Sequence, residues 1–585
     1  MTTSSPNNQS NMLNPNKPPS SDTPLDNLNT TTFLQAQPKQ HLSSPPRILI
    51  IGAGSRGTAY AAAALRTTNS TIAAVCEPVA YKRRLFGERF IWGAGNEALP
   101  HQAFASWEDW VAYEVDRRER AARGEGEGEA VERGVDVVFV CVLDEMHEGV
   151  VCGIAGAGLE VHVCVEKPLG TRLEACLRMY RALGGGCEKK KEKEKETVFG
   201  ICHVLRYSPH NMLLRHLVLE EEVVGDVLSL EHTEPVGWWH FSHSYVRGNW
   251  RKESTTAPSL LTKSCHDIDF ILWLLCSPPR KSNNTAPHLP SHLTSTGSRT
   301  FFRKERKPKA AGDATNCLSC AHEPECQYSA TKIYLDRHLK QGRTGWPVKI
   351  VNPEIEECYR TAGLEAASNK LLGSLKEDWS AETPVSEVEA RPWFGRCVWE
   401  ADNDVCDDQT VTITWEDDPV VNQDGHTELK GRGAKTAQFH MVAFTEKICE
   451  RRGRIYGTKG EIEYDSETIK VHDFATGKTK IHVPHQAGGG HGGGDEGLVR
   501  QFLLAVDAVD SKKMSAAEAQ RHFLGCDLDE AFRSHAAVFA AEEARVERKV
   551  VDWKKWWDER VESQLSLHGR QGQGDEAGSP VGGLN

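Results

Sequence analysis

The feature that most constrains this chain is a glycine-rich turn between an apolar strand and an alanine-rich helix. Residues 47–57 are "RILIIGAGSRG", so Gly52, Gly54 and Gly57 have the spacing G-x-G-x-x-G. In such a turn the first glycine allows a tight bend, the second lets a pyrophosphate approach the backbone, and the third lets the helix pack on the sheet. The free N–H groups at the helix start favour phosphate. The turn therefore predicts a dinucleotide site.

Three further positions belong to this predicted cofactor site. Ser55 and Arg56 lie within the loop, and Glu77 ends the next apolar strand. An acid at that distance accepts hydrogen bonds from ribose hydroxyls, which favours NAD. Basic side chains that follow are suited to a 2′-phosphate and keep NADP open: Lys82, Arg83 and Arg84.

The first half of the chain alternates between apolar strands and helices. The segments predicted as strands are 47–54, 71–78, 135–143 and 160–168. Buried strands alternating with helices indicate a parallel sheet covered on both faces. The predicted fold class is α/β, with an N-terminal Rossmann doubly wound parallel sheet over residues 47–200.

Residues 201–550 are predicted to form a C-terminal substrate and oligomerisation domain, which is α/β with a large open, mostly antiparallel sheet. Alternating apolar and polar residues predict its strands: 226–237, 410–417, 434–445, 451–458 and 460–465. Apolar residues three and four apart predict a helix over 260–275. A stretch rich in Pro, Ser and Lys, at about 278–312, is predicted as an insert.

Composition narrows the class of protein. The formal net charge of −12 argues against nucleic-acid binding, which calls for a basic face. No run approaches the roughly 18 apolar residues of a membrane span, and the N-terminus lacks the regions of a signal peptide. We therefore expect a cytoplasmic protein whose 17 cysteines are reduced thiols. Residues 1–46 and 566–585 have few large apolar residues and are predicted to be disordered tails.

A charged pair ends one of the predicted core strands. Residues 163–170 are "VCVEKPLG", so Glu166 and Lys167 follow three apolar residues. A lysine at the carboxyl end of a strand in a doubly wound sheet lies where ligands bind. Desolvation and a cationic nicotinamide both favour its neutral amine, which would exchange a proton with a substrate alcohol. The alternative is a surface lysine before a turn.

The combination of "GAGSRG", "EKP" and "HDID" resembles the Gfo/Idh/MocA family of NAD(P)-dependent oxidoreductases, over about residues 47–550. The resemblance implies a Rossmann domain, a C-terminal α/β domain with an open sheet, and substrate in the cleft between them. It also implies homo-oligomers built through the second sheet. Within the family the Glu-Lys-Pro segment brings its lysine, here Lys167, beside the nicotinamide and the substrate hydroxyl. Glu166 and His147 are placed near the cofactor.

His266 is the second predicted catalytic residue, on the segment "LLTKSCHDIDF". Many members of the family carry an aspartate four residues before this histidine, where this chain has Thr262. Lys263 follows at the next position, and we expect it either to position the substrate or to replace the missing group. The alternative is a histidine that is simply satisfied within its helix.

Two further segments supply predicted substrate contacts. The resemblance implies that "CHVLRYSP" lines the cleft, and "EPVGWWHFSHSYVRGNW" combines aromatic platforms with hydrogen-bond donors, which suits sugars and polyols. Structural roles between domains or subunits remain equally open. The predicted substrate-binding residues are Arg206, Tyr207, His243 and Arg247.

The segment "CLSCAHEPEC" places Cys317, Cys320 and Cys326 in a C-x2-C-x5-C arrangement. Thiolates so spaced can hold a structural Zn²⁺ with a fourth ligand from elsewhere, such as Cys358 or His322. Ordinary thiols are the alternative.

Together these patterns predict an NAD(P)-dependent oxidoreductase acting on a CH–OH group of a sugar, cyclitol or related polyol. Two alternatives stay open. Some relatives of the fold use bound NAD⁺ transiently to cleave glycosidic bonds. The missing aspartate before His266 favours a non-enzymatic sensor or scaffold that keeps the dinucleotide site.

Overall fold

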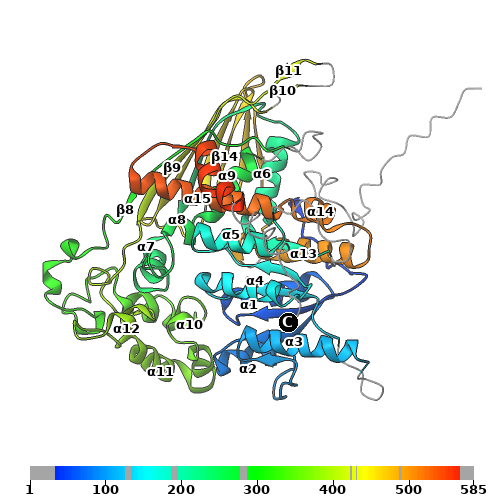
Figure 1. Cartoon of the computed structure of the whole chain (residues 1–585). Helices are drawn as coiled ribbons and strands as arrows, with labels where there is room; N and C mark the ends of the chain where they lie inside the picture. Colours follow the sequence, from blue (N-terminus) through cyan, green and yellow to red (C-terminus); the bar gives the residue numbers. More distant parts are fainter. Residues whose placement is uncertain are drawn as a thin grey trace, which may run out of the picture.

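The computed structural model describes residues 33–124, 133–185, 196–276, 286–421, 425–429, 431–486 and 490–566. Figure 1 shows two large β-sheets, one in the lower half of the view and one in the upper half, with helices between and around them. A two-stranded ribbon extends from the upper sheet and consists of β10 (Val420–Val421) and β11 (Thr427–Glu428).

The lower sheet has six parallel strands in the order β3-β2-β1-β4-β5-β6. This is the strand order of a Rossmann fold, and it confirms the predicted doubly wound sheet. Its strands are β1 (Arg47–Ile51), β2 (Thr71–Cys76), β3 (Ala103–Phe104), β4 (Val137–Val140), β5 (His162–Val165) and β6 (Phe199–Ile201).

Helices cover both faces of the six-stranded sheet. Because successive side chains of a strand point to opposite faces, Ile48 and Ile50 of β1 pack in one core cluster with α1 (Ser55–Thr67) and α13 (Gly494–Asp510). Leu49 and Ile51 pack in the other cluster. The helices in that second cluster include α3 (Trp107–Ala122), α4 (His147–Gly156) and α5 (Leu173–Ala182).

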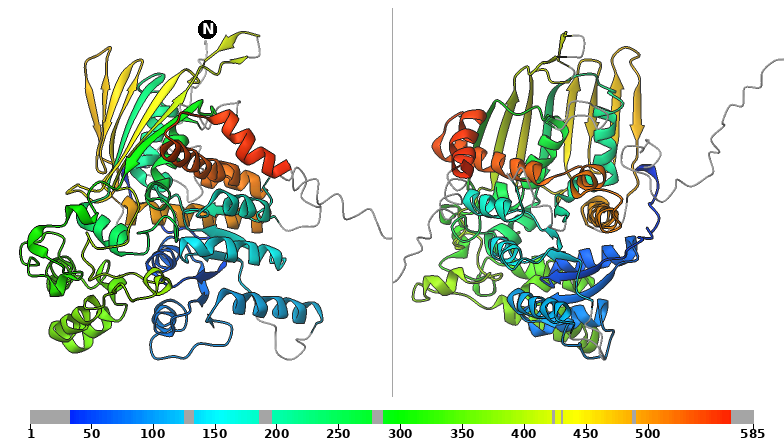
Figure 2. Two further views of the ribbon diagram at one scale, coloured as in Figure 1. Left: turned by 60° about the vertical axis from the view of Figure 1, so that its left-hand side comes forward. Right: turned by 45° about the vertical axis from the view of Figure 1, so that its right-hand side comes forward.

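The upper sheet has nine strands in the order β16-β15-β14-β13-β7-β12-β9-β8-β17. The pair β12 and β7 is parallel and all other neighbours are antiparallel, which confirms the predicted open, mostly antiparallel sheet. Figure 2 shows that helices cover only one face of it. Its strands are β7 (Val227–Pro235), β8 (His292–Ser298), β9 (Asp408–Trp415), β12 (Lys435–Val442), β13 (Arg452–Gly457), β14 (Gly460–Tyr464), β15 (Ile469–Asp473), β16 (Thr479–His482) and β17 (Val551–Asp552).

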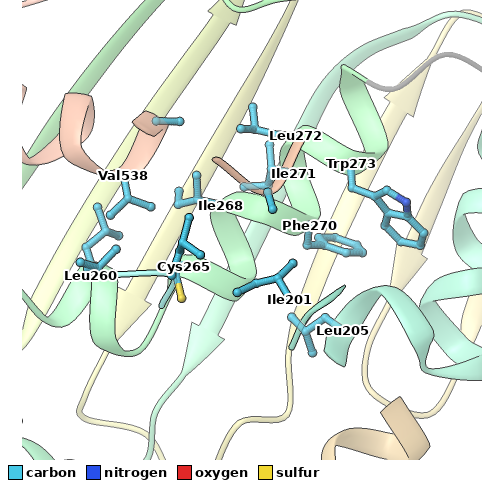
Figure 3. Close-up of a cluster of buried hydrophobic side chains, with 14 of the residues drawn as sticks. Ile201, Leu205, Leu260, Cys265, Ile268, Phe270, Ile271, Leu272, Trp273 and Val538 are labelled. Atoms are coloured by element: carbon cyan, nitrogen blue, oxygen red, sulfur yellow. The ribbon is translucent and has the colours of Figure 1, made fainter. Parts of the chain in front are cut away.

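The helix predicted over 260–275 forms two helices, α8 (Ser259–Thr262) and α9 (Cys265–Leu275), with a break at Lys263. All eleven residues of α9 are buried, as a helix that is apolar on nearly every side requires. Figure 3 shows its side chains among those of neighbouring elements, including Ile201 and Val538. Since α9 cannot move without opening this core, it holds its few polar residues in fixed positions.

The remaining helices surround these cores. The α-helices among them are α2 (Ala80–Phe90), α6 (Pro209–Leu219), α7 (Trp238–Phe241), α10 (Val348–Val351), α11 (Ile355–Leu375), α12 (Val385–Glu389), α14 (Ala516–Ala519), α15 (Leu528–Glu547) and α16 (Trp553–Trp557). The other short helical turns are η3 (Asp144–Met146), η4 (Val204–Tyr207), η5 (Ser242–Arg247), η6 (Lys304–Arg306), η7 (Lys309–Ala311), η8 (Cys317–Ser319), η9 (Thr331–Asp336), η10 (Leu339–Gln341), η11 (Gly490–Gly493), η12 (Gln520–Leu524) and η13 (Asp558–Glu562). Among all helices of the described segments, none combines the length and apolarity that crossing a membrane requires.

Two predicted boundaries are wrong. The N-terminal tail predicted to end at residue 46 packs on the protein from residue 33 onward: Phe33 and Leu42 are buried, and Ser43 donates to Asp507 at 2.9 Å. The insert predicted at 278–312 contains strand β8, which pairs with β9 and β17. Residues 1–32, 277–285 and 567–585 of these predicted segments lie outside the described residues.

The long excursion from the upper sheet lies further along the chain, between the end of β8 at Ser298 and the start of β9 at Asp408. It carries α10, α11 and α12, and in Figure 1 it descends beside the six-stranded sheet to the level of α2. Arg84 Nη2 of α2 lies 3.8 Å from Glu357 Oε2 of α11, so the excursion reaches the Rossmann half.

Candidate active site

The glycine turn has the geometry that a pyrophosphate site requires. Gly52 has φ +99°, and a Cβ there would lie 2.5 Å from the carbonyl oxygen of Cys141. A Cβ at Gly57 would lie 2.1 Å from the carbonyl oxygen of Gly52, because α1 packs closely on the turn. At Gly54, by contrast, a Cβ would meet no atom within 4 Å. The buried hydroxyl of Ser55 has no partner among the described residues, so the open side of the turn fits a phosphate group.

Glu77 closes the same turn from the end of β2. Its carboxylate accepts from the N–H groups of Ala53 at 2.9 Å and Val79 at 3.1 Å. Of the nearby basic side chains, Arg84 donates to Glu88 at 2.9 Å, and Arg83 donates to the backbone carbonyl of Glu77. The acid is thus held in place at the position where a ribose would lie in a Rossmann fold.

Arg56 connects the glycine turn to two other segments. Its guanidinium donates to Glu166 at 2.7 Å and to both carboxylate oxygens of Asp495 at 2.7 and 3.0 Å. Burial alone would raise the pKa of Glu166, but the charges of Arg56 and Lys167 outweigh it and lower that pKa below its ordinary value. Asp495 also accepts from His491 at 3.0 Å, so η11 and the start of α13 border this site.

Lys167 points across from β5 to the helix pair of the C-terminal half. It is half-buried, and its Nζ donates to the backbone carbonyl of Thr262 at 2.7 Å. The turn that carries it is fixed on both sides. The carbonyl of Pro168 accepts from Nδ1 of His147 at 2.8 Å, and the N–H of Leu169 donates to Nε2 of His535 at 2.8 Å. The lysine amine is therefore held between the two halves of the molecule.

These bonds also fix the protons on two imidazoles. Because a carbonyl oxygen only accepts, His147 carries its proton on Nδ1, and its buried Nε2 has no partner among the described residues. His535 accepts on Nε2 and donates to Ala531 from Nδ1, and burial lowers its pKa to about 4.

His266 lies at the start of the buried helix α9, next to Lys167. Its ring centroid is 5.8 Å from that of His203 and 5.9 Å from that of His491. Burial, followed by the charge of Lys167, lowers the pKa of His266 well below its ordinary value. Its buried Nδ1 has no hydrogen-bond partner among the described residues. His266 is therefore a neutral imidazole beside the lysine amine.

Lys263 belongs to a buried charge network rather than standing free. Its Nζ lies 3.0 Å from Glu234 Oε1 and donates to Cys449 Sγ at 2.9 Å. Glu234 also pairs with Arg451 at 2.7 Å, and Arg451 pairs with Asp267 at 2.9 Å. Burial would lower the pKa of Lys263, but Cys449 and Glu234 outweigh it and raise that pKa. Lys263 is thus a permanent cation near the base of α9.

Asp144 is a further carboxyl group near Lys167. Burial raises its pKa, while the charge of Lys167 acts in the opposite direction. Its Oδ2 accepts from the indole Nε1 of Trp250 at 2.9 Å. Trp250 comes from the C-terminal half, so this bond also joins the two halves at the site.

The four predicted substrate-binding side chains are buried and already bonded within the protein. Arg206 donates to both oxygens of Asp269 at 2.7 Å, and Tyr207 donates to the carbonyl of Leu524 at 3.1 Å. These contacts give the predicted substrate role of Arg206 and Tyr207 no support. They serve instead to anchor α9 and η4.

The same holds for the two candidates on η5. His243 bonds through Nδ1 to the hydroxyl of Tyr334 at 2.9 Å. Arg247 donates to the carbonyls of Arg396 at 2.6 Å and Tyr328 at 2.7 Å. Both side chains therefore tie η5 to the long excursion between β8 and β9.

Comparison with known proteins agrees with this geometry. Residues 46–185 match the profile described as "Oxidoreductase family, NAD-binding Rossmann fold", GFO_IDH_MocA. The match covers most of the six-stranded Rossmann half, so this part of the chain is similar to the NAD-binding domain of Gfo/Idh/MocA oxidoreductases. A search of curated protein sequences finds no match.

Solved structures resemble both halves of this chain. An inositol dehydrogenase homolog complexed with NAD⁺ from Azotobacter vinelandii matches 88% of this chain and 100% of its own, at 13% identity and a TM-score of 0.52. An oxidoreductase domain protein from Kribbella flavida matches 86% of this chain and 98% of its own, at 14% identity and a TM-score of 0.51. At such identities the likeness establishes the fold.

The predicted zinc site is not supported. Within the described residues, no group of three or more His, Cys, Asp or Glu side chains is arranged to hold a metal ion. Cys317 is buried beside the guanidinium of Arg247, whose Nη2 lies 3.4 Å from its sulfur. Cys320 and Cys326 are free thiols, and burial raises the pKa of Cys326. A cation already beside Cys317 disfavours a second positive charge there.

Several residues that shape the candidate site could not be predicted from the sequence. Glu234, Arg451 and Cys449 come from β7 and from the residues before β13, and they belong to no local motif. The sequence offered one indirect sign of these residues. Thr262 stands where an aspartate was expected, so the charge of Lys263 had to be balanced by a residue from elsewhere in the chain. The carbonyl of Thr262, rather than its side chain, receives Lys167.

Two glycine substitutions separate cofactor binding from folding. We expect the thermal midpoint of Gly54→Ala to stay within about 2 °C of the parent value, because the new Cβ meets no protein atom. NADH binding should weaken at least tenfold, because this Cβ enters the open space of the phosphate site. Gly57→Ala is expected to lower the thermal midpoint itself, because its Cβ collides with Gly52. Thermal unfolding and a fluorescence titration with NADH measure both effects. Equal NADH affinity in Gly54→Ala and the parent would contradict the assigned phosphate position.

Proposed function

We propose that this chain is an NAD(P)-dependent dehydrogenase that transfers a hydride between the nicotinamide and a hydroxyl-bearing carbon of a sugar, cyclitol or related polyol. The observation that carries the proposal is the position of Lys167. Its amine is half-buried at the end of β5, held by Thr262 and adjacent to a neutral histidine on α9. A hydroxyl group that reached this amine would lie at the carboxyl edge of a Rossmann sheet, where the reacting end of a dinucleotide is found.

The protein residues divide the work of proton transfer and positioning. Lys167 exchanges the proton of the substrate hydroxyl, and Thr262 fixes the direction of its amine. His266, being neutral, accepts a hydrogen bond from a neighbouring hydroxyl. Lys263, being charged, stabilises negative charge on substrate oxygen. When bound, the nicotinamide cofactor supplies the hydride acceptor or donor.

The cofactor-binding residues support NAD rather than NADP. The carboxylate of Glu77 stands at the end of β2 and would repel a 2′-phosphate. Arg84, one of the basic side chains suited to that phosphate, is paired with Glu88 and Glu357. Gly54, Ser55 and the start of α1 would hold the pyrophosphate.

A substrate screen with both cofactors tests the proposal. The chain would be incubated with a panel of sugars, inositols and other polyols, and reduction of NAD⁺ or NADP⁺ followed by absorbance. We expect turnover of at least one polyol and a kcat/KM for NAD⁺ at least tenfold above that for NADP⁺. Hydrolysis of a glycoside without net reduction of cofactor would instead show a glycosidase. NADH binding without turnover of any polyol would favour a sensor.

We also propose that the protein acts in the cytoplasm as a homo-oligomer, with no nucleic-acid or membrane partner. The support is the nine-stranded sheet, of which one face lacks helices in the described residues (Figure 2). A sheet face of this size usually packs against another surface. Light scattering or analytical ultracentrifugation gives the oligomer size.

A further inference from the structure

Trp346 is a large aromatic side chain of the long excursion between β8 and β9, and it packs against α7 and η5. Its ring centroid lies 5.1 Å from that of Trp239, 4.9 Å from His240 and 5.6 Å from His243. The two histidine contacts are edge-to-face, at 85° and 82°. Trp346 is nevertheless 40% exposed, so one part of the ring is packed and the rest is open.

A short series of contacts joins Trp346 to the proposed catalytic residues. Lys263 Nζ donates to Cys449 Sγ at 2.9 Å, and Cys449 Sγ lies 3.7 Å from Nδ1 of His240. His240 in turn contacts Trp346. Only two side chains therefore separate the Lys263 ammonium from the tryptophan. Lys263 directly follows Thr262, whose carbonyl accepts from Lys167, so this series of contacts begins beside the proposed catalytic lysine.

The location of Trp346 within the excursion places it at the junction of the two halves. It directly precedes α10, and eleven residues later Glu357 lies 3.8 Å from Arg84 of the Rossmann helix α2. Figure 1 shows this stretch passing from the level of α7 to the level of α2. Trp346 thus belongs to a stretch that contacts α7 through Trp239 and His240 and reaches the Rossmann half at Glu357.

The chemistry of this region suits a sugar ring. An exposed indole face stacks on the apolar C–H face of a sugar, while neighbouring polar groups meet its hydroxyls. Trp239 is 5% exposed, and its buried indole Nε1 has no partner among the described residues. The half-buried His240 adds an imidazole. The region thus combines a partly exposed indole with an imidazole and an unpartnered indole N–H in the same aromatic cluster.

We propose that Trp346 determines specificity by forming a distal subsite for the second ring of a disaccharide or glycoside, whose first ring reacts at Lys167. The inference rests on the proposed dehydrogenase function and narrows its substrate class. Binding energy from the distal ring would raise kcat/KM without any change at the reacting carbon.

The test compares each monosaccharide with a disaccharide that carries it: glucose with maltose and cellobiose, and galactose with lactose. In the parent enzyme at least one disaccharide should have a kcat/KM about tenfold above its monosaccharide. Trp346→Ala should abolish that advantage and leave the kcat/KM for the monosaccharide within about twofold of the parent value. Trp346→Phe should retain most of the advantage. Phe444→Ala is the matched control, because Phe444 is equally exposed at 40% but packs on Phe301 and Phe302.

Two results would overturn the inference. One is a parent enzyme whose kcat/KM for each monosaccharide equals or exceeds its kcat/KM for the corresponding disaccharides. The other is a Trp346→Ala variant that loses both activities to the same extent. If no sugar is oxidised with either cofactor, the proposed function fails, and calorimetric titration of the disaccharides into the NADH-bound protein decides the subsite. Binding that weakens at least tenfold in Trp346→Ala supports it, and unchanged or undetectable binding rejects it.

Discussion

Replacing Lys167 with methionine is expected to lower kcat about 10²–10⁴-fold while NADH affinity stays within about threefold of the parent. The expected loss is that of a general acid–base group. Methionine has nearly the same length but no amine, so it cannot exchange a proton with a substrate hydroxyl or donate to the carbonyl of Thr262. Steady-state kinetics on the polyol found in the screen and a fluorescence titration with NADH measure the two quantities.

The matched control is Lys263→Met, which removes the neighbouring ammonium. Lys263 is bonded to Glu234 and Cys449, so its loss leaves part of a buried charge network unbalanced. We expect a lower thermal midpoint and a higher KM, with the pH profile of kcat retained. Activity within tenfold of the parent in Lys167→Met would contradict the assigned role.

Local sequence was sufficient to predict most of the Rossmann half. The strands β1, β2, β4 and β5 are short apolar runs, each followed by a helix, and the glycine spacing marks the turn after β1. The two-residue strand β3 has no such run and was not predicted. Strand β8 escaped prediction because "HLTSTGS" contains one large apolar side chain, Leu293, which is buried. Its strand conformation comes from pairing with β9, more than 100 residues later in the chain. A local sequence pattern could not predict the order of the strands in the larger sheet either.

The site was predictable in its residue types but not in the directions of its side chains. Arg206 and Arg247 have the chemistry of substrate-binding residues, yet Asp269 and the carbonyl of Arg396 bind them in the interior. These partners are 63 and 149 residues away, so no spacing rule reveals them. Trp346 could not be predicted for the same reason, because it contacts Trp239 only where the excursion folds back onto α7.

Acidification from pH 7.5 to 5 is expected to lower the thermal midpoint steeply. Burial lowers the pKa of His203 and of His243 to about 3, and that of His535 to about 4, against an ordinary value of 6.5. Below pH 6.5 the unfolded chain binds a proton at each of these residues while the folded chain does not, so the free energy of unfolding falls as pH falls. At pH 5 each histidine lowers the free energy of unfolding by about 2 kcal/mol, and the three together lower it by about 6 kcal/mol. This sum is comparable to the whole free energy of unfolding of a typical domain.

Differential scanning calorimetry across this pH range, with proton uptake measured on unfolding, checks the expectation. His243→Gln should take up about one proton fewer between pH 5 and 6, because the buried imidazole bonded to Tyr334 is gone. His440→Gln is the control, since His440 lies on β12 and 42% of its side chain is exposed to water. A thermal midpoint that stays constant from pH 7.5 to 5 would contradict the burial of these rings, because an imidazole that protonates equally well in the folded and unfolded chain contributes nothing to the pH dependence of stability.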